Sequence, residues 1–284
     1  MGKYYPSKET KPIKRVLVSI IYHNQEIDLE KLLNKIVIKK KDSFLIIFDN
    51  IKNIFLNKRL KKKYKNINFI FGKRKTNKVP FYRNQALEYA KKKYKILLFL
   101  DSDVLPDKNI VEKHYKGHLK YNLIPVIGGT VKPSFTIKQK SIWEKIDGCM
   151  SWFTSLENNS DKIIKFPYHL PTCNMSIKLD FLIKKHIKFD SNLTTGEDVD
   201  FCNKIVKAGG DLLLLKKTQV THFDRISFKN FLQHQKNWGK HHYYIRYKNN
   251  LIFKKKQKLF YFSFFIFYPF LIPFISLIAT YLNM

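Results

Sequence analysis

Acidic residues are scarce in this chain of 284 residues: 22 Asp and Glu stand against 54 Lys and Arg, which gives a formal net charge of +32. Such an excess indicates phosphate-rich partners or an anionic membrane surface. Lys, Asn, Ile, Phe and Tyr are all abundant, as expected of an AT-rich genome, so the charge alone does not separate function from codon usage. A hydrophobic content of 44% and an aromatic content of 15% exclude a disordered chain.

Cysteine is nearly missing as well. Cys149, Cys173 and Cys202 have neither the spacing of a metal site nor the even number of a disulfide framework, so we expect reduced, buried thiols in a cytosol-facing domain. Residues 1–14 form a basic extension without the apolar core of a signal peptide. No linker rich in Gly, Ser or Pro interrupts residues 15–225, which predicts one folded domain.

Charge is absent from one long segment near the C-terminus. Residues 259–284 contain no charged side chain, and residues 259–282 are almost wholly apolar and long enough to span a bilayer as a helix. The lysine-rich residues 254–258 precede this predicted membrane segment and place its flank in the cytoplasm. Pro269 and Pro273 would kink a spanning helix, so an interfacial or re-entrant segment is the alternative.

Between these ends, short apolar runs alternate with segments of helical periodicity. Strands interleaved with helices favour an α/β fold: a doubly wound, mostly parallel sheet flanked by helices. The predicted strands are residues 15–21, 43–48, 66–71, 95–100 and 211–215, and the predicted helices are residues 29–38, 83–93 and 197–208.

Two carboxylates follow the apolar run at residues 96–100. Asp101 and Asp103, separated by Ser102, lie at the carboxyl end of that predicted strand. Open α/β sheets bind ligands at the carboxyl ends of their strands. Two carboxylates there can hold a divalent cation that in turn holds phosphate oxygens. An acidic turn without a ligand is the alternative.

A second acidic cluster is formed by Glu197, Asp198 and Asp200 at the start of a predicted helix. Helix capping would explain it, because the positive end of the helix dipole favours anions. A group transfer from a nucleotide diphosphate, however, needs a site that neutralises the leaving phosphate and, opposite it, a base for the acceptor hydroxyl. Two carboxylate clusters far apart in the sequence fit that need.

Six motifs in order carry a resemblance to a known family. They are VLVSIIYHNQ (16–25), FDN (48–50), FYRNQALEYA (81–90), LLFLDSDV (97–104), TCNMSI (172–177) and GEDVDFCNKIVKAGG (196–210). The ordered set resembles the family 2 glycosyltransferases, inverting enzymes of GT-A fold. The resemblance implies a nucleotide-sugar half at residues 15–105 and an acceptor half at residues 106–225.

The resemblance also implies the residues that contact the donor nucleotide. Ile21 and Tyr22 would line the pocket for the base, and Asp49 would contact the base or the ribose. Arg83 and Asn84 would approach the nucleotide from the start of a helix.

Further implied roles concern the reaction itself. Asp103 would be a direct ligand of Mn²⁺ or Mg²⁺, Asp101 would lie at the metal and nearer the ribose, and His222 would supply a third metal ligand. Asp198 would be the general base, and Glu197 would orient the acceptor.

The acceptor side is less defined. Trp143 and Asn174 fall in the segment where acceptors bind in relatives, although aromatic rings equally form protein core. The basic, aromatic connector at residues 226–258 is suited to anionic lipid headgroups.

These patterns together predict a metal-dependent inverting glycosyltransferase at the cytoplasmic membrane face. It would move a sugar from a nucleotide-diphosphate sugar, a UDP-sugar above all, to a glycan or lipid-linked acceptor, and it would bind no nucleic acid. A nucleotidyltransferase is one alternative, but it needs a Gly-rich phosphate loop, and residues 21–25 contain no glycine. A non-enzymatic basic module is another, and it leaves the two carboxylate clusters unexplained.

Overall fold

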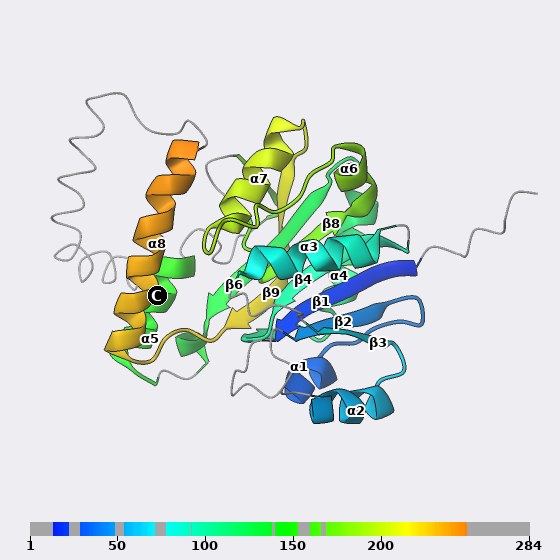
Figure 1. The fold of residues 1–284 in the computed structure, drawn as a ribbon, viewed down its shortest axis with the longest axis horizontal. Coiled ribbons are helices and arrows are strands. Elements are labelled where there is room, and N and C mark those ends of the chain that lie inside the picture. Colours follow the sequence, from blue (N-terminus) through cyan, green and yellow to red (C-terminus); the bar gives the residue numbers. More distant parts are fainter. Residues whose placement is uncertain are drawn as a thin grey trace, which may run out of the picture.

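The computed structural model describes residues 14–22, 29–48, 54–71, 78–91, 93–137, 140–152, 160–165 and 169–248. The predicted nucleotide contact Asp49 and the predicted membrane segment at residues 259–282 lie outside these ranges. In chain order the elements are β1 (Lys14–Tyr22), α1 (Leu29–Lys35), β2 (Ser43–Phe48), α2 (Ile54–Lys63), β3 (Ile67–Phe71), α3 (Val79–Ala90), β4 (Tyr94–Asp101), β5 (Val104–Pro106), α4 (Ile110–Lys120), β6 (Val126–Pro133), η2 (Ser134–Thr136), α5 (Ile142–Trp152), β7 (Lys162–Ile164), β8 (Asn174–Lys178), α6 (Leu179–Lys184), α7 (Glu197–Lys207), β9 (Leu212–His222) and α8 (Phe228–Lys248) (Figure 1).

One mixed sheet organises these elements. Its strand order is β3-β2-β1-β4-β8-β6-β9-β5, with β7 also paired to β9. The predicted α/β sheet is confirmed, but only β1 to β4 and the pair β6–β9 are parallel. β8 is antiparallel to β4 and β6, and β5 and β7 are antiparallel to β9. The expectation of a mostly parallel sheet is therefore wrong for the second half, because an apolar run does not reveal strand direction.

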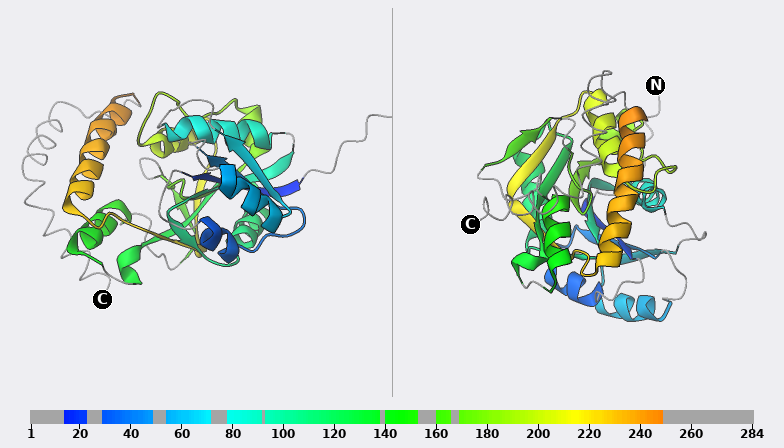
Figure 2. Two further views of the ribbon diagram at one scale, coloured as in Figure 1. Left: turned by 60° about the horizontal axis from the view of Figure 1, so that its bottom comes forward. Right: turned by 90° about the vertical axis from the view of Figure 1, so that its left-hand side faces the viewer.

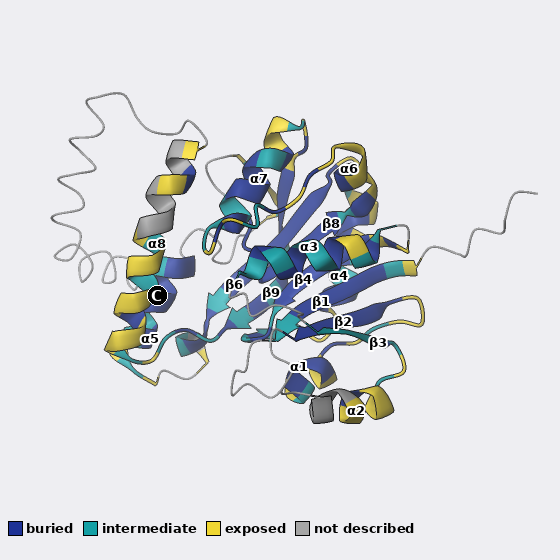
Figure 3. Cartoon of the chain, viewed as in Figure 1, coloured by how far each residue is buried: buried dark blue, intermediate teal, exposed yellow. Residues whose placement is uncertain are grey.

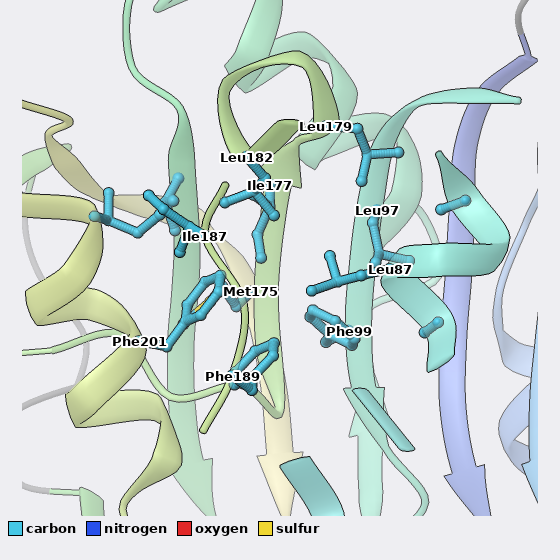
Figure 4. Packing of buried hydrophobic residues seen from close by; sticks show 14 of the residues in the cluster. Leu87, Leu97, Phe99, Met175, Ile177, Leu179, Leu182, Ile187, Phe189 and Phe201 are labelled. Carbon is cyan, nitrogen blue, oxygen red and sulfur yellow. The ribbon is translucent and has the colours of Figure 1, made fainter. Parts of the chain in front are cut away.

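Helices cover both faces of the sheet. Along β1 the side chains alternate: Leu17 packs in a core with α3, α6 and α7, while Val16 and Val18 pack in a second core with α1, α2 and α4. Figure 4 shows the first core, where Phe201 of α7 stacks on Phe189 at 4.0 Å between ring centroids. In Figure 3 the middle strands are buried along nearly their whole length. This burial on both faces explains why these strands read as continuous apolar runs.

Several predicted boundaries shift in the structure. α3 begins at Val79 rather than at residue 83, with Pro80 in its first turn, where the missing N–H of proline costs no helical hydrogen bond. α1 ends at Lys35, three residues before its predicted end. β9 continues to His222, well beyond residue 215, and this extension carries a candidate metal ligand into the sheet.

The basic connector contains a long helix. α8 occupies residues that the sequence assigned to a basic aromatic connector, and Figure 2 shows it along one end of the molecule, beside α5 and reaching α7. Within the ranges that the structure describes, no helix combines the length and the apolar character needed to cross a bilayer.

Two histidines of α4 are buried against β8. His114 Nδ1 lies 2.8 Å from Ser176 Oγ, His114 Nε2 lies 2.8 Å from Asn174 Oδ1, and His118 Nε2 lies 2.9 Å from Ser176 Oγ. Burial lowers the pKa of His114 to about 4 and that of His118 to about 3. Both rings are thus held neutral in the folded chain.

We expect the free energy of unfolding to fall as the pH is lowered from about 6.5, because the unfolded chain then binds protons that the folded chain excludes from His114 and His118. Each histidine contributes up to roughly 1.4 kcal/mol per pH unit. Urea unfolding between about pH 7 and 5 measures this slope. His118→Asn keeps a hydrogen-bonding group and should reduce the slope, whereas the exposed control His186→Gln should not. Equal slopes in His118→Asn and the unchanged protein would contradict the assignment.

Candidate active site

The two predicted metal-binding aspartates and the predicted histidine meet at one edge of the sheet. Asp101 ends β4, Asp103 lies in the turn to β5, and His222 ends β9, where it pairs with Val104 of β5. One ligand atom from each of Asp101, Asp103 and His222 lies within 4.8 Å of the others. His222 Nε2 is 3.5 Å from Asp103 Oδ1. Residues separated by more than a hundred positions therefore form one possible metal site.

The donor set fits a divalent cation that accepts both oxygen and nitrogen. Two carboxylates with one imidazole suit Mn²⁺. Asp224 orients the imidazole, since its Oδ1 lies 3.3 Å from His222 Nδ1 and accepts a 2.8 Å hydrogen bond from Trp152 Nε1. Burial alone would lower the pKa of His222, but Asp103 and Asp224 raise it above its ordinary value. The sequence analysis assigned no role to Asp224, and its place two residues after His222 is the signal that could have found it.

Arg83 connects the two acidic clusters. Its guanidinium is buried between an ion pair with Glu197, at the start of α7, and a 3.2 Å ion pair with Asp101. Burial alone would lower the pKa of Arg83, but Glu197 and Asp101 raise it. Burial raises the pKa of Glu197 and of Asp101, and Arg83 offsets part of that increase in each. The guanidinium therefore favours the charged form of both carboxylates, against the effect of burial.

Asp198 lies next to this pair and remains partly open to solvent. Its side chain is 20% exposed, and its Oδ2 is 3.7 Å from His169 Nε2. Cys173 is buried beside the acidic side chains: burial raises the pKa of its thiol well above the usual value, and Asp101, Asp103 and Asp198 raise it further. The predicted base and the predicted metal ligands thus surround one point in the fold.

The residues predicted to contact the nucleotide base lie beside this point. Ile21 pairs with Asp101 across the β1–β4 ladder, and Tyr22 follows it at the end of β1. Asn84 is turned elsewhere: its amide donates to the carbonyl of Phe189 at 2.9 Å and accepts from the Phe189 backbone N–H at 3.0 Å. Asn84 thus holds the segment before α7 in place.

The residues predicted to bind the acceptor have other contacts. Asn174 is fully buried and donates to the carbonyl of Thr130 at 3.1 Å, so its amide faces the protein interior in this structure, and a contact with an acceptor stays a prediction. Glu197, expected to orient the acceptor, faces Arg83 instead. Trp143 packs against Phe228 of α8 with ring centroids 4.5 Å apart, and a role in acceptor binding stays a prediction.

No family model matches the chain. Over 237 residues it is 25% identical to the minor teichoic acid biosynthesis protein GgaB of Bacillus subtilis (strain 168). The match covers 79% of this chain and 24% of GgaB, so the chain spans about a quarter of that relative.

Solved structures show the same fold. S. aureus TarS (residues 1–349) in complex with UDP-GlcNAc has a TM-score of 0.57 at 17% identity, over 75% of this chain and 59% of TarS. GalNAc-T7 with UDP, GalNAc and Mn²⁺ has a TM-score of 0.56 at 16% identity, over 76% of this chain and 45% of GalNAc-T7. Both neighbours are glycosyltransferases of GT-A fold, and the chain has that fold. The GT-A fold that the sequence resemblance implies is therefore confirmed.

Arg83→Met should reduce the free energy of unfolding by about 3 kcal/mol, because it leaves the Glu197 carboxylate buried without its partner. Arg83→Lys should lose less, since it keeps the charge but not the planar fork. Urea unfolding at neutral pH measures both. Lys188→Met, which breaks an exposed ion pair with Glu88, is the matched control and should change little. An Arg83→Met protein as stable as this control would contradict the role given to Arg83.

Proposed function

We propose that this chain is an inverting glycosyltransferase that transfers a sugar from a UDP-sugar to a hydroxyl group. The observation that carries the proposal is the Arg83 bridge, because it brings the acidic start of α7 to the acidic turn after β4. A protein that needed these carboxylates only for helix capping or for a surface turn would have no reason to join them through a buried guanidinium. The UDP and UDP-GlcNAc complexes of TarS support the choice of donor.

Asp101, Asp103 and His222 would hold the cation, and Mn²⁺ in GalNAc-T7 supports that choice. A bound divalent cation supplies neutralisation of the charge that develops on a departing diphosphate. Asp224 would keep the His222 ring in the orientation that turns Nε2 towards Asp103. Ile21 and Tyr22, at the adjacent strand end, would flank the nucleotide.

The proposed reaction uses Asp198 as the base. The acceptor oxygen forms a bond to the anomeric carbon while the bond from that carbon to UDP breaks, and UDP leaves with the electron pair. The acceptor proton passes to the Asp198 carboxylate. Asp198 is better suited than Glu197, because the carboxylate of Glu197 is paired with Arg83 whereas Asp198 is partly exposed.

The proposed acceptor is a cell-surface polymer or its lipid-linked precursor. The similarity to GgaB, a teichoic acid biosynthesis protein, supports a phosphate-bearing glycan of this kind. The net charge of +32 also suits a polyanionic acceptor or an anionic membrane. We further propose attachment to the cytoplasmic face of the membrane through residues 259–282.

Asp103→Asn and Asp198→Asn should separate nucleotide binding from chemistry. In the unchanged protein, UDP should raise the melting temperature more when Mn²⁺ is present. Asp103→Asn should lose that metal-dependent increment. Asp198→Asn should keep that increment. It should release UDP from UDP-GlcNAc or UDP-GalNAc at least about 10²-fold more slowly than the unchanged protein, with purified teichoic acid as the acceptor probe.

Asp107→Asn, in a partly exposed ion pair with Lys113, is the control for these variants and should behave like the unchanged protein. If UDP and Mn²⁺ leave the melting temperature unchanged, the donor assignment fails. If Asp198→Asn turns over normally, another group is the base.

The membrane proposal predicts that the full chain sediments with phosphatidylglycerol vesicles and that a chain ending at residue 258 sediments much less. Loss of the apolar run at residues 259–282 removes the hydrophobic contribution to membrane binding. Only the salt-sensitive attraction between lysines and anionic lipid then remains. Equal sedimentation of the two chains at high salt would refute attachment through residues 259–282.

A further inference from the structure

The first half of helix α8 contacts chain segments close to the possible metal site of Asp101, Asp103 and His222. Asp147 of α5 is fully buried and lies 2.8 Å from His234 Nδ1. It also accepts hydrogen bonds from Gln235 Nε2 at 3.2 Å and from the backbone N–H of Arg225 at 3.3 Å. Arg225 directly follows Asp224, the residue that orients His222. The first half of α8 is thus tied to the chain segment that leaves β9.

The last turns of α8 are fixed to the other acidic cluster. Ile245 is buried against Gly196, the residue before α7, where a Cβ atom would overlap the Ile245 side chain. Lys248 forms ion pairs with Asp190, in the loop before α7, and with Asp200 in its first turn, at 3.1 Å from Asp200 Oδ1. Asp200 is itself buried, so the ion pair with Lys248 fixes the first turn of α7 at a buried carboxylate.

We propose that α8 is a brace that sets the position of the Asp198 carboxylate relative to His222, with Ile245 and Lys248 as its positioning residues. This inference rests on the proposed transfer reaction. One end of α8 contacts the chain segment that follows the metal ligand His222, and the other end contacts the segment that carries the proposed base. Asp198 lies between Gly196 and Asp200, the two residues that the last turns of α8 contact. Loosening the last turns of α8 therefore moves the base and leaves the β4–β5 turn in place, because Asp147 still holds the first half of the helix.

The physical reason for such a brace lies in the weak hold on the start of α7. Gly196, the N-cap residue of α7, has a left-handed backbone with φ of 71°. It has no side chain that could cap the helix by a hydrogen bond. Asn84 holds the preceding loop at Phe189, and Arg83 holds Glu197, but both contacts come from α3 on the donor side. On the opposite side the described contacts to Gly196 and Asp200 come from α8 and from Lys204 of α7 itself.

Lys248→Met tests the brace in the full-length protein. It should lower kcat for UDP release with teichoic acid by about tenfold or more, because a small displacement of a base is costly. KM for the UDP-sugar and the Mn²⁺-dependent melting increment with UDP should stay within about twofold of the unchanged protein. Lys248→Arg should restore kcat, since it keeps both ion pairs. Lys236→Met, at an exposed position on α8, should match the unchanged protein.

Hydrogen exchange supplies a readout that does not need turnover. Amides in the first turn of α7, including the Asp200 N–H that bonds to the Gly196 carbonyl at 3.2 Å, should exchange faster in Lys248→Met than in Lys236→Met. Unchanged kcat or unchanged exchange in Lys248→Met would overturn the brace, as would an equal loss of donor affinity. If the unchanged protein turns over no UDP-sugar, the proposed function fails, and the exchange result still decides whether α8 holds α7.

Discussion

The candidate site depends on one buried, positively charged side chain, the guanidinium of Arg83. Arg83 lies between Asp101 and Glu197, and without its charge the burial of the Glu197 carboxylate would be unfavourable. Such an ion pair adds little net stability compared with an apolar contact of the same size. Its effect is geometrical, because it forces the start of α7 to lie against the end of β4. The chain segments before and after residue 105 meet at this guanidinium.

The sheet supplies the rest of the geometry. β4 and β9 are not neighbours in the strand order, yet the short strand β5 pairs with β9 and brings the turn after Asp101 to His222. The backbone N–H of Phe223 donates to the carbonyl of Asp103 at 3.0 Å and fixes this approach. A polar site can lie here because the apolar cores on the two faces keep the strand ends in register.

Much of the first half of the fold follows from its sequence. Residues 44–48 and 96–100 are continuous apolar runs, and strands buried on both faces give that pattern. The grouping of Asp101, Asp103 and His222 was also predictable, although only through the family resemblance. The antiparallel direction of β8 was not, because Asn174 to Lys178 alternates polar and apolar residues without indicating direction.

The roles of individual polar residues were harder to predict. Asn174 belongs to a motif shared with the family, yet it serves His114 and Thr130 inside the protein. Glu197 and Asp198 are adjacent in the sequence and look equivalent there. Only the helical rotation between them places one carboxylate on Arg83 and leaves the other towards solvent. Which of two neighbouring acids is available for chemistry is a property of packing.

Gly196 leaves the chain with little freedom to vary at this position. Its backbone conformation disfavours any side chain, and the Ile245 methyl group occupies the space that a side chain would need. The two restrictions have separate origins, so repacking α8 with a smaller residue would remove the second and leave the first. A saturation library at residue 196 would for this reason still favour glycine, followed by Asn and Asp, even in a background where Ile245 is alanine.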